Sequence, residues 1–143
     1  MSVPDARSVP EGASRDRIRR IVRERQLVGL ANDTKWTELL TRMRQHDGGR
    51  PPFRCKCIDS SQVTRWDSEW IYHPPMPLLV IEWLDVRLVR VERVGRLVPD
   101  RVVERFPWVV PALVRIGFDM EVRSDVVRIF GYAPRDLTGL EVR

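Results

Sequence analysis

Apolar side chains recur at helical spacing in two stretches near the start of the chain. The first, residues 14–27, carries a narrow apolar stripe and has Ser14 in the position of an N-cap. The second, residues 35–45, follows the segment NDT, each residue of which can cap a helix. It keeps the spacing i, i+3, i+4 and i+7 in Trp36, Leu39, Leu40 and Met43. We therefore predict two helices, the second of which buries these four side chains.

Alternation of apolar and basic residues replaces the helical spacing at residues 53–58, FRCKCI. This pattern predicts a strand with Phe53, Cys55 and Cys57 on one side. The two cysteines are the only ones in the chain. A bridge between residues only two apart is strained, so we expect both to be reduced thiols.

The longest apolar run lies inside residues 66–85, WDSEWIYHPPMPLLVIEWLD, which also hold three of the five Trp. We interpret this stretch as a Trp-rich hairpin, with a strand over 66–72, a turn at its three prolines and a return strand from Leu78. Residues 86–94 mix the two periods and permit either a longer return strand or a helix.

Helical spacing returns over residues 102–116, between the start signal at Pro99 and a C-cap at Gly117. Pro107 interrupts this pattern, which predicts either a kink or a second helix that begins there. Beyond it, residues 118–123 and 126–132 are two short alternating runs separated by Ser-Asp, a pattern typical of a hairpin.

These elements define the fold class and the domain organisation. Strands joined as hairpins and placed between helices predict an α+β domain, an antiparallel sheet of about four to five strands with two to three helices packed on it. Residues 1–13 have too little apolar surface to offset the entropy of ordering, so we expect a flexible tail there. Residues 14–143 then form a single domain, long enough to bury a core.

Composition is that of a globular protein, with 43% apolar and 31% charged residues. The sequence has no window of 18 apolar residues, and no apolar stretch follows the first charges as it would in a secretory signal. We therefore expect a cytoplasmic protein. The net charge of +5 permits binding to nucleic acid or to an acidic protein, but the basic residues alternate with acidic ones, which favours solvated faces.

The first predicted helix is the part of the chain most similar to a nucleic-acid-binding element. Its basic residues are Arg15, Arg17, Arg19, Arg20, Arg23 and Arg25. One alternative function is therefore a nucleic-acid-associated protein that uses Arg15, Arg19, Arg20 and Arg23. No aromatic side chain interleaves them to stack on a base, which favours a solvated helix face instead.

Few residues suggest a reaction or a cofactor. The sequence has no Gly-rich phosphate loop and no Ser in a nucleophile-elbow context, and we expect no cofactor. Cys55, Cys57 and His73 match the usual zinc spacings poorly. A second alternative is a metal-dependent enzyme centred on Asp67, Glu69 and His73.

The simpler interpretation places the Trp residues of the hairpin in the core and its carboxylates in solvent. The exposed face would then form a partner-binding surface, composed of Asp67, Glu69, Tyr72, His73, Glu82 and Asp85. Trp, Tyr and Arg dominate the energetics of protein interfaces, and Trp and Arg are plentiful here.

Four short motifs extend through the chain, NDTKW at 32–36, WDxEWxYH at 66–73, IEW at 81–83 and IFGY at 129–132. As a set they resemble a family of small uncharacterised bacterial proteins, over residues 30–133. In size and fold class this family is similar to immunity proteins, which neutralise a co-encoded toxin. The resemblance implies a non-enzymatic, toxin-blocking protein. Because the chain is basic, such a toxin would present an acidic surface or bind mainly through apolar contacts.

Overall fold

The computed structural model describes residues 11–133, and their side chains from residue 14 onward. Its helices are α1 (Glu11–Glu24), α2 (Asp33–Gln45) and α3 (Val109–Ile116), with a 3-10 turn at Leu78–Val80. Its strands are β1 (Phe53–Cys57), β2 (Ile81–Arg87), β3 (Val89–Glu92), β4 (Arg101–Arg105), β5 (Met120–Arg123) and β6 (Val126–Phe130).

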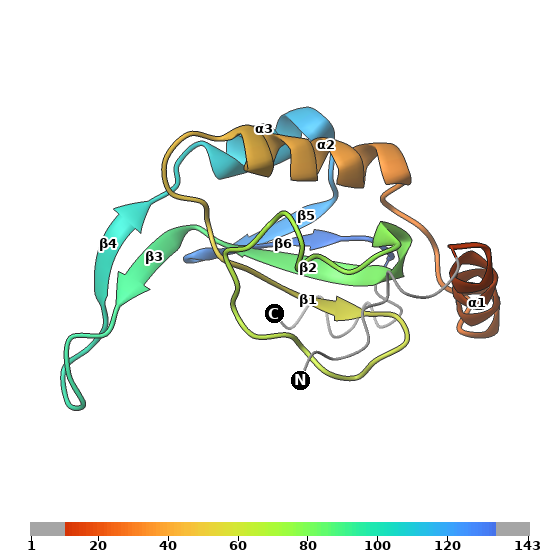
Figure 1. Ribbon diagram of the computed structural model, residues 1–143, viewed down its shortest axis with the longest axis horizontal. Helices are drawn as coiled ribbons and strands as arrows, with labels where there is room; N and C mark the ends of the chain where they lie inside the picture. Colours follow the sequence, from red (N-terminus) through yellow and green to blue (C-terminus); the bar gives the residue numbers. More distant parts are fainter. Residues whose placement is uncertain (1–10, 134–143) are drawn as a thin grey trace.

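Four strands form one antiparallel sheet in the order β1-β2-β6-β5, and β3 and β4 pair as a separate antiparallel ribbon. Helices α2 and α3 lie together over one face of the four-stranded sheet (Figure 1). The β3–β4 ribbon projects from one end of the molecule and α1 lies at the other (Figure 1). The predicted α+β fold class is confirmed.

The core lies between the two helices and the sheet. All four apolar residues predicted for α2 are buried, and Trp36 packs against Phe118 with ring centroids 5.2 Å apart. The helix begins because the Asn32 side chain accepts a hydrogen bond from the backbone N–H of Lys35 at 2.9 Å, as an N-cap does. Phe106, just after β4, is buried in the same core.

The first helix begins earlier than predicted. It starts at Glu11, so Ser14 lies inside it and is not the cap. Residues 1–10 of the expected tail lie outside the described residues. The helix ends at Glu24 because Gln26 takes a left-handed backbone conformation, with φ of 54°. Ile18 anchors α1 in a small second core with Ile58 and Tyr132.

The predicted strand over residues 66–72 is wrong. Only Asp67 pairs there, in an isolated bridge with Phe53, and a turn follows. The Glu69 carboxylate accepts hydrogen bonds from the backbone N–H groups of three successive residues, Ile71, Tyr72 and His73. These N–H groups therefore cannot join a sheet ladder. The return strand exists as β2, but it starts at Ile81 rather than Leu78.

The predicted helix over residues 102–116 is half wrong. Residues 101–105 form β4, which pairs with β3, and only Val109–Ile116 is helical. Val102 and Val103 are β-branched and fit a strand as well as a helix, and pairing with β3 decides the outcome. The C-cap at Gly117 is confirmed, since its φ is 97° and its N–H bonds to Leu113 O at 3.0 Å.

The last predicted hairpin is confirmed as β5 and β6, with Ser124 at a φ of 50° in the turn. Within residues 86–94, β2 ends at Arg87, β3 spans Val89–Glu92, and residues 93 and 94 lie outside any strand. Leu88, between the two strands, donates its N–H to Asp125 O at 2.6 Å. This bond fixes the point where the ribbon leaves the sheet.

Candidate partner-binding face

The sheet has a second face, opposite α2 and α3, on which the charged residues gather. Side chains alternate across a strand, so the residues between the core positions of each strand point away from the helices. We call this side the outer face. It comprises Arg54, Lys56, Trp83, Asp85, Arg87, Glu121, Arg123, Val126, Arg128 and Phe130.

One row of the outer face alternates in charge across all four strands. Arg54 lies opposite Asp85, Asp85 opposite Arg128, and Arg128 opposite Glu121. Opposite charges on directly paired residues stabilise a sheet, so the register itself builds this row.

Asp85 is the centre of the row, and its exposed fraction is 0%. Arg128 donates two hydrogen bonds to its carboxylate, from Nε at 2.7 Å and from Nη2 at 3.1 Å, and Arg54 Nε donates a third at 3.0 Å. A buried carboxylate is tolerated when it is paired and hydrogen-bonded in this way. Our expectation that Asp85 lies on an exposed surface is therefore wrong.

Arg54 and Arg128 also make cation–π contacts with tryptophan rings. The Arg128 guanidinium carbon lies 3.6 Å from the ring centroid of Trp83, and that of Arg54 lies 4.5 Å from the ring centroid of Trp66. Arg87 approaches the Trp66 ring as well, at 5.6 Å. Trp66, Arg54, Asp85, Arg128 and Trp83 thus form one continuous network, in which cation–π contacts and charge-assisted bonds fix each side chain.

A pocket of about 330 Å³ opens beside this network. Its lining consists of Arg54, Asp85, Glu121, Arg123, Val126 and Arg128. Three guanidinium groups against two carboxylates leave a net positive charge. Arg123 and Arg54 each use only Nε in a hydrogen bond to a carboxylate among the described residues. Their other N–H groups can therefore bind an acidic group of a partner.

Four of the predicted site residues lie together in the loop before the 3-10 turn. Asp67 pairs with the His73 ring through one carboxylate oxygen and accepts the N–H of Glu69 at 2.8 Å through the other. Asp67 and His73 line a pocket of about 170 Å³, and Trp66 of the network lines the same pocket. Tyr72 is 64% exposed at the edge of this loop.

Glu69 organises the loop through hydrogen bonds to its backbone. Burial opposes the ionisation of its carboxyl group, but the backbone N–H groups of Tyr72, Ile71 and His73 outweigh that effect. Its pKa is lowered as a result. A carboxylate that caps three backbone donors has a structural role.

Glu82 makes its contacts away from that loop. It accepts hydrogen bonds from Lys56 Nζ at 2.8 Å and from Arg25 Nη1 at 3.1 Å. Arg25 also donates to Ile58 O at 2.7 Å. Glu82 therefore attaches the turn that follows α1 to the sheet, and the six predicted residues do not form one surface.

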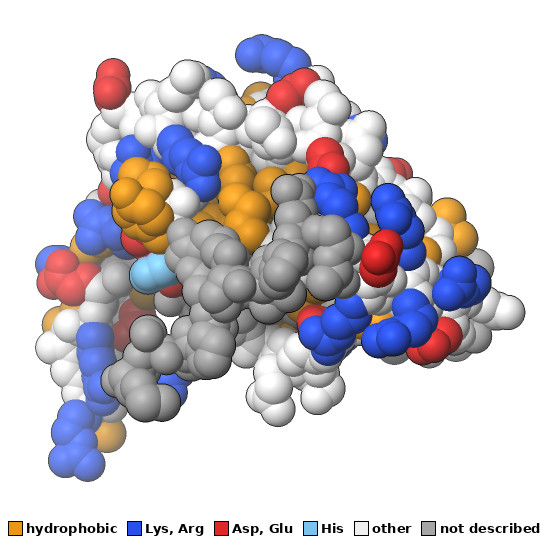
Figure 2. Space-filling model, turned by 45° about the vertical axis from the view of Figure 1, so that its right-hand side comes forward, with side chains coloured by type: hydrophobic (Ala, Val, Ile, Leu, Met, Phe, Trp, Pro, Cys, Tyr) orange, Lys and Arg blue, Asp and Glu red, His pale blue; other side chains and the backbone are white. Residues whose placement is uncertain are grey.

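Three arginines of α1 form ion pairs with other described residues. Arg15 pairs with Asp33, Arg17 with Asp59 and Arg19 with Asp16, at 3.5, 3.4 and 3.2 Å. Basic and acidic side chains are mixed over this end of the molecule (Figure 2). Arg20 and Arg23 make no ion pair with a described residue. The helix therefore does not present the uniform basic surface that phosphate binding favours.

Residues 14–133 contain no group of three His, Cys, Asp or Glu side chains placed to hold a metal ion. The two cysteines are free thiols. Cys55 is buried, and a hydrogen bond from Cys57 lowers the pKa of Cys55, while the same bond and burial raise that of Cys57. The two thiols thus interact with each other. The Thr64 hydroxyl donates to Cys55 Sγ at 4.0 Å and accepts the backbone N–H of Cys55 at 2.9 Å.

Sequence reasoning missed the outer face. The signal for it is the alternation of Arg54 with core residues in β1 and of Arg128 with core residues in β6. The alternation shows that these arginines face away from the core. It does not show that they meet at Asp85, because the chain alone does not give the order of the strands.

The chain belongs to DUF6678, a family of unknown function, whose model matches residues 18–136. The match begins inside α1, so the limits of the expected resemblance, residues 30–133, were too narrow. No curated protein and no solved structure was found to match the chain. No helix in the described part of the chain is long and apolar enough to cross a membrane.

Proposed function

We propose that this protein is a non-enzymatic, cytoplasmic binding module that attaches to a partner protein through its outer face and blocks it, as an immunity protein blocks a toxin. The observation that carries the proposal is the network that joins Trp66 and Trp83 through two arginines and Asp85. Trp and Arg are the residue types most often responsible for interface affinity.

The contacts of the network lie within the protein itself and need no partner to form. Immobilising a side chain on binding costs roughly 0.5–1.5 kcal/mol when the side chain is free to rotate. Arg54 and Arg128 are already held by Asp85 on one side and by an indole ring on the other. Little further ordering is needed, so more of the contact energy appears as affinity.

The charge of the outer face indicates what kind of partner fits. Arg87 and Arg123 add to the two arginines of the network, against the carboxylates Asp85 and Glu121, whereas Lys56 is paired with Glu82. A partner with acidic side chains around an apolar centre complements this face. The loop with Asp67, Glu69, Tyr72 and His73 would lie at the rim, where Tyr72 is exposed.

The test is protection and binding against a toxin encoded beside this gene. Trp66→Ala combined with Arg123→Ala removes one side chain of the network and one of the outer face without opening the core, because neither is buried. The double variant should weaken binding by at least about tenfold, or about 1.4 kcal/mol. Arg115→Ala is the matched control, because Arg115 lines a groove between α2 and α3 on the other side of the sheet. Equal binding by the wild type, the double variant and the control would refute the proposal.

A second candidate is supported by the same face. Tryptophan rings and arginines on an antiparallel sheet are also the components of single-stranded nucleic-acid platforms. Against it, the Trp83 ring is covered by Arg128, which leaves less of it to stack on a base. A salt series separates the two functions. Phosphate-driven binding falls by orders of magnitude between about 50 and 200 mM salt, whereas an interface with an apolar centre changes far less.

A further inference from the structure

The pocket beside Asp85 owes its shape to the register of the sheet. Val126, which lines it, lies opposite Arg87 on β2 and opposite Arg123 on β5, and all three residues belong to the outer face. Arg87 approaches the Trp66 ring and is not part of the lining. A short valine between two arginines therefore leaves a hollow in a face that is otherwise covered by long side chains.

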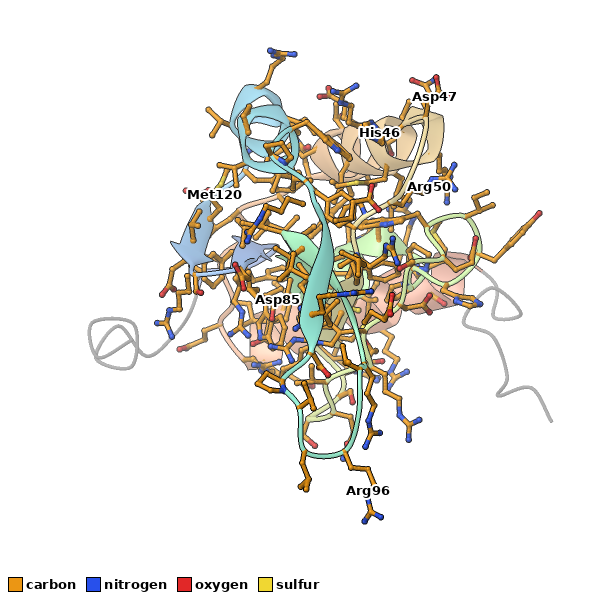
Figure 3. The ribbon with its side chains drawn as sticks, turned by 90° about the vertical axis from the view of Figure 1, so that its left-hand side faces the viewer. His46, Asp47, Arg50, Asp85, Arg96 and Met120 are labelled. Atoms are coloured by element: carbon orange, nitrogen blue, oxygen red, sulfur yellow. The ribbon has the colours of Figure 1, made fainter. Side chains whose placement is uncertain are left out.

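The pocket lies on the side of the sheet away from the helices. Figure 3 shows Asp85 on the opposite side of the sheet from α2, whose C-terminal end is marked by His46. The pocket volume of about 330 Å³ is at the lower end of the range for small-molecule sites, about 300–1,000 Å³. The pocket therefore has the size of a small-molecule site.

Hydrogen-bond donors that are still available gather in this lining. Arg54, Arg123 and Arg128 reach the pocket from three different strands. Arg54 and Arg123 each use only Nε in their bonds to carboxylates, and Arg128 uses Nε and Nη2. Among the described residues, two nitrogens of Arg54, two of Arg123 and one of Arg128 thus form no hydrogen bond. Guanidinium groups stay charged and offer their N–H groups in a planar fork, which suits an oxyanion.

The two carboxylates of the lining are already paired with arginines. Asp85 accepts bonds from Arg54 and Arg128, and Glu121 accepts one from Arg123. Three guanidinium groups against these two carboxylates leave the lining with a net charge of +1. The balance of charge therefore favours an anion over a cation.

We propose that this pocket is a binding site for the phosphate group of a small molecule. A phosphate has more acceptor oxygens than a carboxylate and can accept hydrogen bonds from several guanidinium groups at once. Three guanidinium groups that approach from three strands suit this shape, whereas one bidentate arginine is enough for a planar carboxylate. The inference goes beyond the proposed function, because the site holds its ligand with no partner protein present.

The test is isothermal titration calorimetry of the purified full chain with inorganic phosphate, at neutral pH and constant ionic strength. Acetate is the comparison anion. Phosphate should bind with a dissociation constant of about 1 mM or lower, and acetate should bind at least about tenfold more weakly. No detectable binding of phosphate would overturn the proposal. Acetate bound as tightly as phosphate would overturn the assignment to a phosphate group.

Two substitutions in the pocket should change the affinity for phosphate in opposite directions. Arg123→Gln removes a guanidinium group and should weaken binding at least about tenfold. Glu121→Gln removes a negative charge and releases Nε of Arg123, so it should tighten binding at least about threefold. The side chains of Arg123 and Glu121 are 47% and 24% exposed, so circular dichroism of both variants should match the wild type. Loss of structure does not produce tighter binding, so Glu121→Gln tests the proposal even if Arg123→Gln lowers stability.

Glu38→Gln and Arg115→Gln are the matched controls. Both residues line the groove between α2 and α3, and their substitutions change the net charge of the chain by the same amounts as those in the pocket. The dissociation constant for phosphate should stay within about twofold of the wild-type value, because salt screens charges at that distance. Equal shifts in the controls and the pocket variants, or no shift in either pocket variant, would overturn the proposal. Neither result decides the test of partner binding, which is measured with the toxin.

Discussion

Asp85 and Arg128 face each other across the β2–β6 pair and share two hydrogen bonds, in a position where the carboxylate has no contact with solvent. The two residues are 43 positions apart in the chain. From the sequence, the Asp85 carboxylate was expected on the surface. Its pairing with Arg128 places it at the centre of a buried network. It also orients the guanidinium group that covers Trp83.

Removing one partner of this pair should be costly. Arg128→Ala leaves Asp85 buried with only Arg54 as a cationic partner, and breaking a buried pair typically costs about 3–5 kcal/mol. We expect about 3 kcal/mol in a denaturant melt, since Arg54 remains. The double variant Asp85→Ala with Arg128→Ala should lose clearly less than the sum of the two single changes. Additive losses would show that the two side chains do not interact.

Trp36 is expected to be the most sensitive residue of the core. It is 1% exposed, and truncation of such a side chain, Trp36→Ala, should cost about 3–5 kcal/mol. Its Nε1 has no hydrogen-bond partner among the described residues. Trp36→Phe removes this unpaired donor and keeps most of the volume, so it should cost at least about 2 kcal/mol less than the alanine variant. Equal losses in urea melts would contradict this assignment.

Gly131 and Gly29 provide a matched pair for a packing test. A Cβ at Gly131 would collide with the backbone oxygen of Ile81 and would lie 3.2 Å from the Trp36 ring. The backbone cannot yield as a side chain does, so Gly131→Ala should cost at least about 2 kcal/mol. A Cβ at Gly29 meets nothing within 4 Å, and Gly29→Ala should be within about 1 kcal/mol of neutral. Similar melting temperatures for the two variants would show that the close approach is absent.

The elements that the sequence predicted correctly are those fixed by local signals. The cap at Asn32, the spacing of α2, the glycine at the end of α3 and the β5–β6 turn all act within a few residues. Each of these signals favours one local structure and does not depend on distant parts of the chain. Periodicity and turn chemistry are therefore sufficient to identify them.

The errors lie where a distant or competing partner decides the structure. Residues 101–105 have helical spacing, but they are a strand because β3 is available to pair with them. Residues 66–72 alternate as a strand does, but Glu69 captures the N–H groups that a ladder would need. Asp85 was placed in solvent because its two arginines come from strands whose order no local pattern gives.

The last prediction concerns the effect of pH on the loop that Glu69 holds together. Its pKa in the folded protein is below the ordinary value of 4.5, so the stability that the ionised carboxylate adds is complete above that value. It is lost as the pH falls through the lower folded value. The protection of the amides of Ile71, Tyr72 and His73 from hydrogen exchange should therefore decrease below about pH 4, relative to amides of α2.

Glu69→Gln isolates this group from its titratable neighbours, Asp67 and His73. The variant keeps an amide oxygen that can accept hydrogen bonds but has no charge to lose. Protection of residues 71–73 should be lower than in the wild type at neutral pH and should show a weaker decrease in acid. An unchanged acid response in the variant would assign the pH dependence to the Asp67–His73 pair instead.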